Sequence, residues 1–388
     1  MTASRGSRNP ATPAPPQPAI AAAVILAAVI GLWPSPLPRT PWLAGLVMAL
    51  CTGVTVGCTM LGLRLCRRPR HTTHWWPTVV VAAVLILASI VNMAWQNTIR
   101  SELGYGSVGP EWVVFLVCPT LAVVAAMVWL PRASALAIAA AISLAAGLLA
   151  PSTGTASAST LSARVTTDAD AKALVRQWVE RGGPDDDAVL IAVPTGSGWI
   201  DPGALAAIGD RVGRMHTIAP RYASTQSWRA FVTDRGAAGR ASVAVLSALT
   251  AELDAVPPQR RPLVILYGQS LGALGAETAR VWADEHRPGA LWTTVLSGVP
   301  ADTIDTHAHG SPRRVIANAT DPVTAWSPAV VWRPPSRPSD TVTVGRPTRH
   351  VPWIPLATFV QTSADLLGSL DGPAGVGHRY RGTDQVPR

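Results

Sequence analysis

One serine of the chain lies where a nucleophilic serine is expected. An apolar run over residues 262–267 leads into Gly268-x-Ser270-x-Gly272, and small, helix-favouring residues follow it. A strand, a sharp turn and a helix in that order form a nucleophile elbow, whose glycines let the turn pack closely against its neighbours. The spacing therefore predicts that Ser270 presents its hydroxyl at the tip of the turn.

Such a serine needs a base to accept its proton and a carboxylate to orient that base. In α/β-hydrolases the acid and then the histidine follow the serine along the chain. Asp321 comes directly after the strand-like residues 315–320, which predicts a carboxylate at the C-terminal edge of a parallel sheet. The alternative for an Asp-Pro pair is a helix cap or a turn. Asp302 and Asp305, after the preceding strand, are the other candidates for the acid.

Two histidines, His350 and His378, follow Asp321 in the sequence. Glycines at 375 and 377 precede His378 and allow the irregular backbone that turns an imidazole inward. His350 stands beside Arg349, as is typical of a surface residue. We therefore predict His378 as the base.

Backbone N–H groups are expected to stabilise the oxyanion that forms during acyl transfer. One donor is predicted at Leu271, directly after the nucleophile, and the second in the loop after an earlier strand. Residues 194–199 fit that loop, with Thr195 and Gly196 as the candidate donors. The alternative, a phosphate-binding loop, lacks the Gly-Lys-Ser/Thr that would follow it.

Metal binding is the other function that histidines in this sequence could have. His307 and His309 lie near Asp302 and Asp305. Two histidines at i and i+2 share a face only in a strand, whereas this segment is loop-like, and no further nearby ligand completes a set. We expect neither a metal nor a cofactor.

Composition and charge place the chain at a membrane. Of its 388 residues, 48% are hydrophobic and 14% are charged, which is too apolar for an ordinary soluble protein. The net charge is +9, but residues 1–163 hold nine arginines against two glutamates, while the remainder is close to neutral. Because the excess lies between apolar segments, where it orients a membrane protein, binding to nucleic acid is not expected.

The chain divides into four parts in this interpretation. Residues 1–18 are predicted to be disordered, 19–150 to form a membrane domain of about five helices, 151–163 to be a flexible linker, and 164–388 to be a catalytic domain. Tryptophans mark the ends of the apolar segments, as in an interfacial belt. The predicted spans are 19–33, 42–65, 75–96, 112–130 and 133–150.

The positions of the basic residues predict on which side of the membrane the catalytic domain lies. The densest cluster, Arg64 to Arg70, follows the second span and should remain cytoplasmic. With five spans, the catalytic domain then lies outside the cytoplasm. If residues 19–33 do not cross the membrane, the parity changes and so does the side.

Short apolar runs alternate with helical stretches after residue 164, and this pattern predicts an α/β fold with a mostly parallel sheet covered on both faces. Residues 323–365 are rich in proline, tryptophan and arginine, and we expect little regular structure in them. They fit a lid over the site or the lining of an acyl- or aromatic-binding groove, and they also fit an amphipathic patch resting on the bilayer; the two interpretations are compatible. The predicted strands are 188–193, 215–219, 263–267, 291–297 and 314–317, and the predicted helices are 171–181, 202–209, 239–254 and 271–285.

Several stretches together resemble a family of bacterial multi-pass membrane proteins with a C-terminal α/β-hydrolase domain. The resemblance implies Ser270 as nucleophile, Asp321 as acid and His378 as base, and it implies no particular substrate. The matching stretches are residues 34–39, 95–96 with 99–100, 194–202, 261–262, 268–272, 321–323 and 377–380.

The sequence thus predicts a membrane-anchored serine hydrolase of the esterase or lipase type. Its expected partners are membrane lipids and a small-molecule or lipid acyl substrate. Two alternatives remain: an acyltransferase that acts on an envelope lipid or glycan, and a non-catalytic membrane scaffold or sensor with a hydrolase-like domain.

Overall fold

The computed structural model describes residues 15–69, 71, 74–129, 160–223, 234–307 and 309–387. The chain forms two compact units, residues 1–146 and 147–388.

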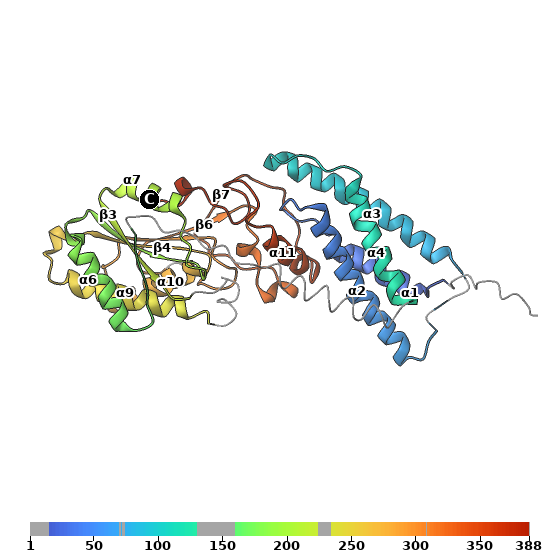
Figure 1. Ribbon diagram of the computed structural model, residues 1–388, viewed down its shortest axis with the longest axis horizontal. Coiled ribbons are helices and arrows are strands. Elements are labelled where there is room, and N and C mark those ends of the chain that lie inside the picture. The colour runs from blue at the N-terminus through green and yellow to red at the C-terminus, as the bar shows by residue number, and fades with distance from the viewer. Residues whose placement is uncertain are drawn as a thin grey trace, which may run out of the picture. The chain divides into compact units, whose positions relative to one another are not determined.

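The N-terminal unit is helical in its described part (Figure 1). Among the described residues, three helices are long and apolar enough to cross a membrane, whereas α1, with 14 residues, is shorter than the roughly 20 that a span needs. The predicted span 133–150 and most of the predicted disordered segment 1–18 lie outside the described residues. The helices are α1 (Pro18–Gly31), α2 (Pro41–Leu65), α3 (Trp76–Leu103) and α4 (Glu111–Trp129).

Small and apolar side chains hold these helices together. Met48 of α2, Leu85 of α3 and Leu116 of α4 are buried in one cluster. The indole N–H of Trp112 donates to Asn92 Oδ1 at 3.1 Å, so a polar pair within this unit is satisfied internally. Large apolar side chains of α3 stay exposed, as expected for a helix surrounded by lipid.

The C-terminal unit is built on one seven-stranded sheet whose strands all pair in parallel, in the order β1-β3-β2-β4-β5-β6-β7. The predicted α/β class is confirmed. The strands are β1 (Thr160–Arg164), β2 (Ala188–Val193), β3 (Met215–Arg221), β4 (Leu263–Gln269), β5 (Thr293–Ser297), β6 (Arg313–Asn318) and β7 (Thr341–Val344).

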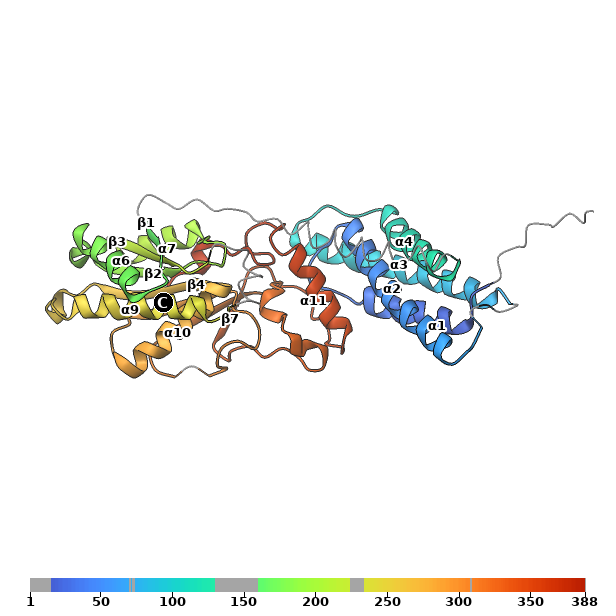
Figure 2. The ribbon, with the colours of Figure 1, turned by 60° about the horizontal axis from the view of Figure 1, so that its bottom comes forward.

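Helices cover both faces of the sheet (Figures 1 and 2). Helices α6 (Asp168–Glu180), α9 (Ala237–Leu253) and α10 (Leu271–His286) pack on one face, where Ile191 and Leu266 are buried. Helix α7 (Pro202–Val212) packs on the other, over Leu190 and Tyr267. Every residue of β2 is buried, as expected for a central parallel strand.

Two segments differ from the sequence prediction. Strand β1 begins at Thr160, inside the predicted linker 151–163, and pairs with β3 at the sheet edge. Residues 323–365 were expected to hold little regular structure. Strand β7 lies within this segment, and helix α11 (Ala357–Leu367) begins in it and ends two residues beyond it. The prolines of that segment end at Pro355, and α11 begins two residues later, at Ala357. The short 3-10 helices are η1 (Gly183–Asp185), η2 (Pro258–Arg260), η3 (Val323–Ala325), η4 (Pro328–Val331) and η5 (Gly382–Asp384).

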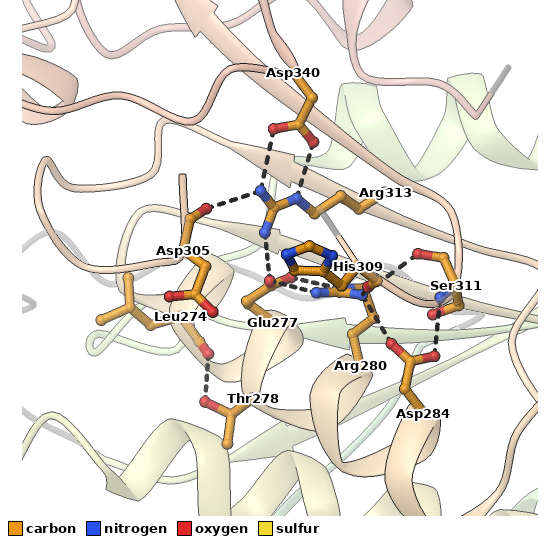
Figure 3. Close-up of polar contacts among 10 residues, drawn as sticks. All are labelled: Leu274, Glu277, Thr278, Arg280, Asp284, Asp305, His309, Ser311, Arg313 and Asp340. Carbon is orange, nitrogen blue, oxygen red and sulfur yellow. Dashed lines mark hydrogen bonds and ion pairs between the residues drawn. The ribbon is translucent and has the colours of Figure 1, made fainter. Parts of the chain in front are cut away.

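A buried cluster of ion pairs ties the start of β6 to α10 and to the residue before β7 (Figure 3). Arg313 donates to Glu277 at 2.6 Å and to Asp340 at 2.9 Å. Arg280 contacts Glu277 at 2.7 Å and Asp284 at 2.8 Å. All three nitrogens of each guanidinium have an acceptor, which offsets the cost of burying the charges. These five residues are the arginine cluster.

Candidate active site

The sheet order brings two loops together at its C-terminal edge. Strands β2 and β4 are neighbours, but the chain leaves β2 for β3 on one side and β4 for β5 on the other. Ligand sites of open α/β sheets lie at such a switch point. A Cβ on Gly272 would stand 2.2 Å from the carbonyl oxygen of Val193, so only glycine fits where the turn after β4 meets the end of β2.

The turn after β4 has the geometry of a nucleophile elbow. Ser270 has φ 56° and ψ −124°, a left-handed backbone conformation that costs a non-glycine residue about 1–3 kcal/mol. Its N–H donates to the carbonyl oxygen of Ser297 at 2.9 Å, which fixes the turn against β5. Helix α10 begins at Leu271, whose N–H has no acceptor within the helix. The predicted strand, turn and helix are therefore all present around Ser270.

Asp321 and His378 lie side by side after β6 and near the end of the chain. His378 Nδ1 is 2.8 Å from Asp321 Oδ2, and both residues are buried. The other carboxylate oxygen, Oδ1, accepts from the N–H of Val323 at 2.8 Å. Within the described part of the chain, the buried His378 Nε2 makes no hydrogen bond. The imidazole is thus oriented through Nδ1, while Nε2, which is also buried, keeps its hydrogen-bonding capacity unused among the described residues.

Hydrogen bonds fix the segment that carries His378 to the segment that carries Asp321. Asn318 Nδ2 donates to the carbonyl oxygens of Gly377 and Arg379 at 2.9 and 3.0 Å. The N–H of Gly377 donates to Thr320 Oγ1 at 2.8 Å. These contacts hold a loop without regular structure in one conformation.

The same loop is also fixed to the turn that carries Ser270. Gln269, directly before Ser270, donates through Nε2 to the carbonyl oxygen of His378 at 3.2 Å. Gly298, which follows the residue that accepts from the Ser270 N–H, has φ +59°, and a Cβ there would stand 2.5 Å from His378 Cε1. Sequence reasoning did not single out Gly298, because its role depends on a contact with a distant loop.

The predicted oxyanion loop is present, but its two candidate donors differ. The N–H of Thr195 donates to the carbonyl oxygen of Trp199 at 2.9 Å, and its hydroxyl lies 3.0 Å from Ser197 Oγ. Thr195 is therefore a poor choice as a backbone donor, which corrects that part of the prediction. The N–H of Gly196 makes no hydrogen bond among the described residues, so Gly196 and Leu271 remain the candidate donors.

The other two candidates for the acid, Asp302 and Asp305, make their contacts away from His378. Asp302 pairs with Arg333 at 3.0 Å and accepts from the hydroxyls of Ser327 and Ser336. Burial by itself would raise the pKa of Asp302, but these hydrogen bonds outweigh it and lower the pKa to about 2. The backbone of Asp305 accepts from Arg313 at 2.9 Å, in contact with the arginine cluster. Neither carboxylate is hydrogen-bonded to His378.

The remaining histidine candidates stand apart from this site. His350 is exposed, and the backbone of His309 accepts from Arg280 at 2.6 Å. In the part of the chain that the structure describes, no group of His, Cys, Asp and Glu side chains is arranged to hold a metal ion.

Comparison with known families decides the relationship. A model of an alpha/beta-hydrolase family matches residues 154–314 and 299–386, and a model of the N-terminus of that family matches residues 32–182. The chain belongs to this alpha/beta-hydrolase family. The family membership confirms the predicted resemblance and fits a hydrolase-like domain preceded by a helical N-terminal region. No match to a curated protein was found.

Proposed function

We propose that this alpha/beta-hydrolase is a membrane-anchored serine hydrolase that cleaves carboxylic esters through an acyl-enzyme. Ser270 is the nucleophile, His378 the general base and Asp321 the residue that orients the base. One observation carries the proposal. A buried carboxylate holds Nδ1 of His378, whose Nε2 has no partner in the described chain, and the strained turn at Ser270 is fixed to the same loop.

Acylation follows from these positions. The Ser270 oxygen attacks the carbonyl carbon of the ester, and its proton passes to His378 Nε2. Asp321 stabilises the imidazolium through Nδ1. The carbonyl oxygen becomes an oxyanion, which the N–H groups of Leu271 and Gly196 stabilise. When the tetrahedral intermediate collapses, the bond to the leaving alcohol breaks and the alcohol takes the proton from Nε2.

Deacylation repeats the steps with water. His378 Nε2 accepts a proton from the water molecule as its oxygen attacks the acyl carbon. Collapse releases the carboxylic acid and returns the proton to Ser270. Both half-reactions need an unprotonated Nε2, so the rate is expected to fall at acid pH.

The N-terminal unit supports membrane anchoring. Its three long apolar helices each have the length and composition of a span. We propose several spans and a catalytic unit on the extracytoplasmic side. Fusions of a reporter to the C-terminus test the side, because alkaline phosphatase is active outside the cytoplasm and green fluorescent protein fluoresces inside.

Hydrolysis of a series of p-nitrophenyl esters tests the activity. The full-length protein in detergent is expected to release p-nitrophenol. The rate of release by Ser270→Ala is expected to be at least a thousandfold lower. Product analysis with an added alcohol separates hydrolysis from transfer. A folded wild-type protein that cleaves no ester and no thioester contradicts the proposal and favours a non-catalytic role.

A further inference from the structure

The tyrosine two residues after His378 makes a contact that the reaction scheme does not use. The hydroxyl of Tyr380 lies 2.5 Å from Asp321 Oδ2, the same oxygen that pairs with His378 Nδ1. It also accepts from the backbone N–H of Asn318 at 3.1 Å. Tyr380 and Asp321 are both buried, with 5% and 2% of their surface exposed. The contact is therefore shielded from water.

The direction of this hydrogen bond follows from the surroundings. Since the Asn318 N–H can only donate, the phenol accepts from Asn318 and donates to Asp321. Burial, the Asp321 charge and the hydrogen bond to Asp321 hold the pKa of Tyr380 well above its ordinary value. The phenol thus keeps its proton at any pH at which the protein works.

Asp321 then has three donors: the phenol and the imidazole on Oδ2, and the N–H of Val323 on Oδ1. A carboxylate held by several donors has a fixed orientation, and its charge is shared among them. The rings of His378 and Tyr380 also meet edge to face, with centroids 5.8 Å apart and an interplanar angle of 86°. The tyrosine therefore constrains both the carboxylate and the imidazole.

We propose that Tyr380 is a positioning residue of the reaction, whose hydroxyl fixes the Asp321 carboxylate against His378 and takes up part of its negative charge. This inference rests on the proposed function, because it assigns a role in the Ser270 chemistry. Its physical part, the coupling of the phenol to the protonation of His378, holds whether or not the protein hydrolyses an ester.

Removal of the Tyr380 hydroxyl should shift the pH dependence of the rate in a predictable direction. Without the phenol, the Asp321 carboxylate keeps more of its charge and favours the protonated imidazole of His378. The charged and titratable groups that act here are Asp321 and Tyr380, with Arg337 acting on Tyr380 by its charge. In Tyr380→Phe the acid limb of the pH–rate profile is therefore expected to move up by as much as about one pH unit.

The experiment compares wild type, Tyr380→Phe and Tyr222→Phe as full-length proteins in detergent. Tyr222 is a matched control, since its buried hydroxyl makes no hydrogen bond within the described chain. The rate of labelling by a fluorophosphonate is measured against pH, together with the melting temperature. At neutral pH we expect Tyr380→Phe to label about tenfold more slowly and Tyr222→Phe to match wild type.

A second measurement separates the two proposals. With ¹⁵N-labelled histidine, the titration of His378 is followed by NMR in wild type and Tyr380→Phe. A displaced titration supports the inference even if wild type does not react with the probe, in which case only the proposed function fails. An unchanged His378 titration and an unchanged labelling rate overturn the role of Tyr380. A lower melting temperature with unchanged labelling per folded molecule overturns it as well.

Discussion

Two polar clusters lie at opposite ends of strand β6, and they differ in how completely their buried polar atoms are hydrogen-bonded. At its start, Arg313 is the centre of the arginine cluster, in which all three nitrogens of each guanidinium have an acceptor (Figure 3). Beyond its end, Asp321 holds His378, and His378 Nε2 is buried without a partner in the described chain. A buried polar group that is left unpaired costs free energy, so it calls for an explanation.

This difference supports the proposal that the first cluster stabilises the fold and the second takes part in chemistry. The arginine cluster joins α10, β6 and the start of β7 and has little capacity left to bind anything else. Asn318 and Tyr380 hold the Asp321–His378 pair in place, and His378 Nε2 is left unpaired within the described chain. We expect substitutions at the first cluster to change stability and those at the second to change reactivity.

The largest effect is expected at the acid. In Asp321→Asn the amide no longer stabilises the imidazolium, so fluorophosphonate labelling should fall by about 10⁴-fold, which corresponds to about 5.5 kcal/mol. Labelling rates of the full-length proteins measure this loss. Asp302→Asn is the matched control and should label like wild type, because Asp302 bonds to Arg333 and two serines instead of His378. Equal losses in both variants would contradict the assignment.

The next effect is on stability. Arg313→Ala removes one of the two arginines that pair with the buried Glu277 and leaves the partly exposed Asp340 without its guanidinium, and removal of one partner of a buried ion pair costs up to about 3–5 kcal/mol. Scanning calorimetry should show a strong drop in melting temperature, while the labelling rate per folded molecule stays unchanged. Loss of labelling in protein that remains folded would show that the two ends of β6 are not independent.

Asp302 gives a pH-dependent effect of intermediate size. Its pKa of about 2 lies below the unfolded value of about 3.9, so the ionised side chain stabilises the fold above pH 4, and this stabilisation is lost as the pH falls towards 2. Asp302→Asn should lower the free energy of unfolding by about 2 kcal/mol at pH 7 and by much less near pH 2. A difference that does not vary with pH would exclude this cause.

The smallest effect is expected for an ion pair in water. Arg287 and Asp254 are 2.8 Å apart, but their side chains are 39% and 54% exposed. Arg287→Ala should cost less than about 1 kcal/mol, since solvent screens the pair. The ratio between this value and that of Arg313→Ala measures how strongly burial amplifies a charge pair. Similar values would contradict the role given to the arginine cluster.

The sequence predicted the centre of the sheet better than its edges. Strand β2 was predicted at its observed bounds, because a central parallel strand is a continuous apolar run. Strands β1 and β7 were missed, since their sequences carry polar residues and only pairing with β3 and β6 defines them.

The candidate site, too, could be predicted only in part from the sequence. Asp321 and His378 could be chosen from chain order and position, and the structure places them in contact. Tyr380 and Gly298 could not be chosen, because their roles depend on distances between segments far apart in the sequence. Thr195 was chosen as a donor, but a turn within its own loop uses its N–H.

One measurement tests the nucleophile most directly. The full-length protein is treated with a fluorophosphonate, and the modified peptide is identified by mass spectrometry in wild type, Ser270→Ala and Ser297→Ala. Ser297 is the matched control, a buried serine at the end of the neighbouring strand whose hydroxyl makes no hydrogen bond in the described chain. We expect a single adduct on Ser270 in wild type and in Ser297→Ala, and none in Ser270→Ala. Labelling that persists in Ser270→Ala, or a folded wild-type protein that does not react, would contradict the account.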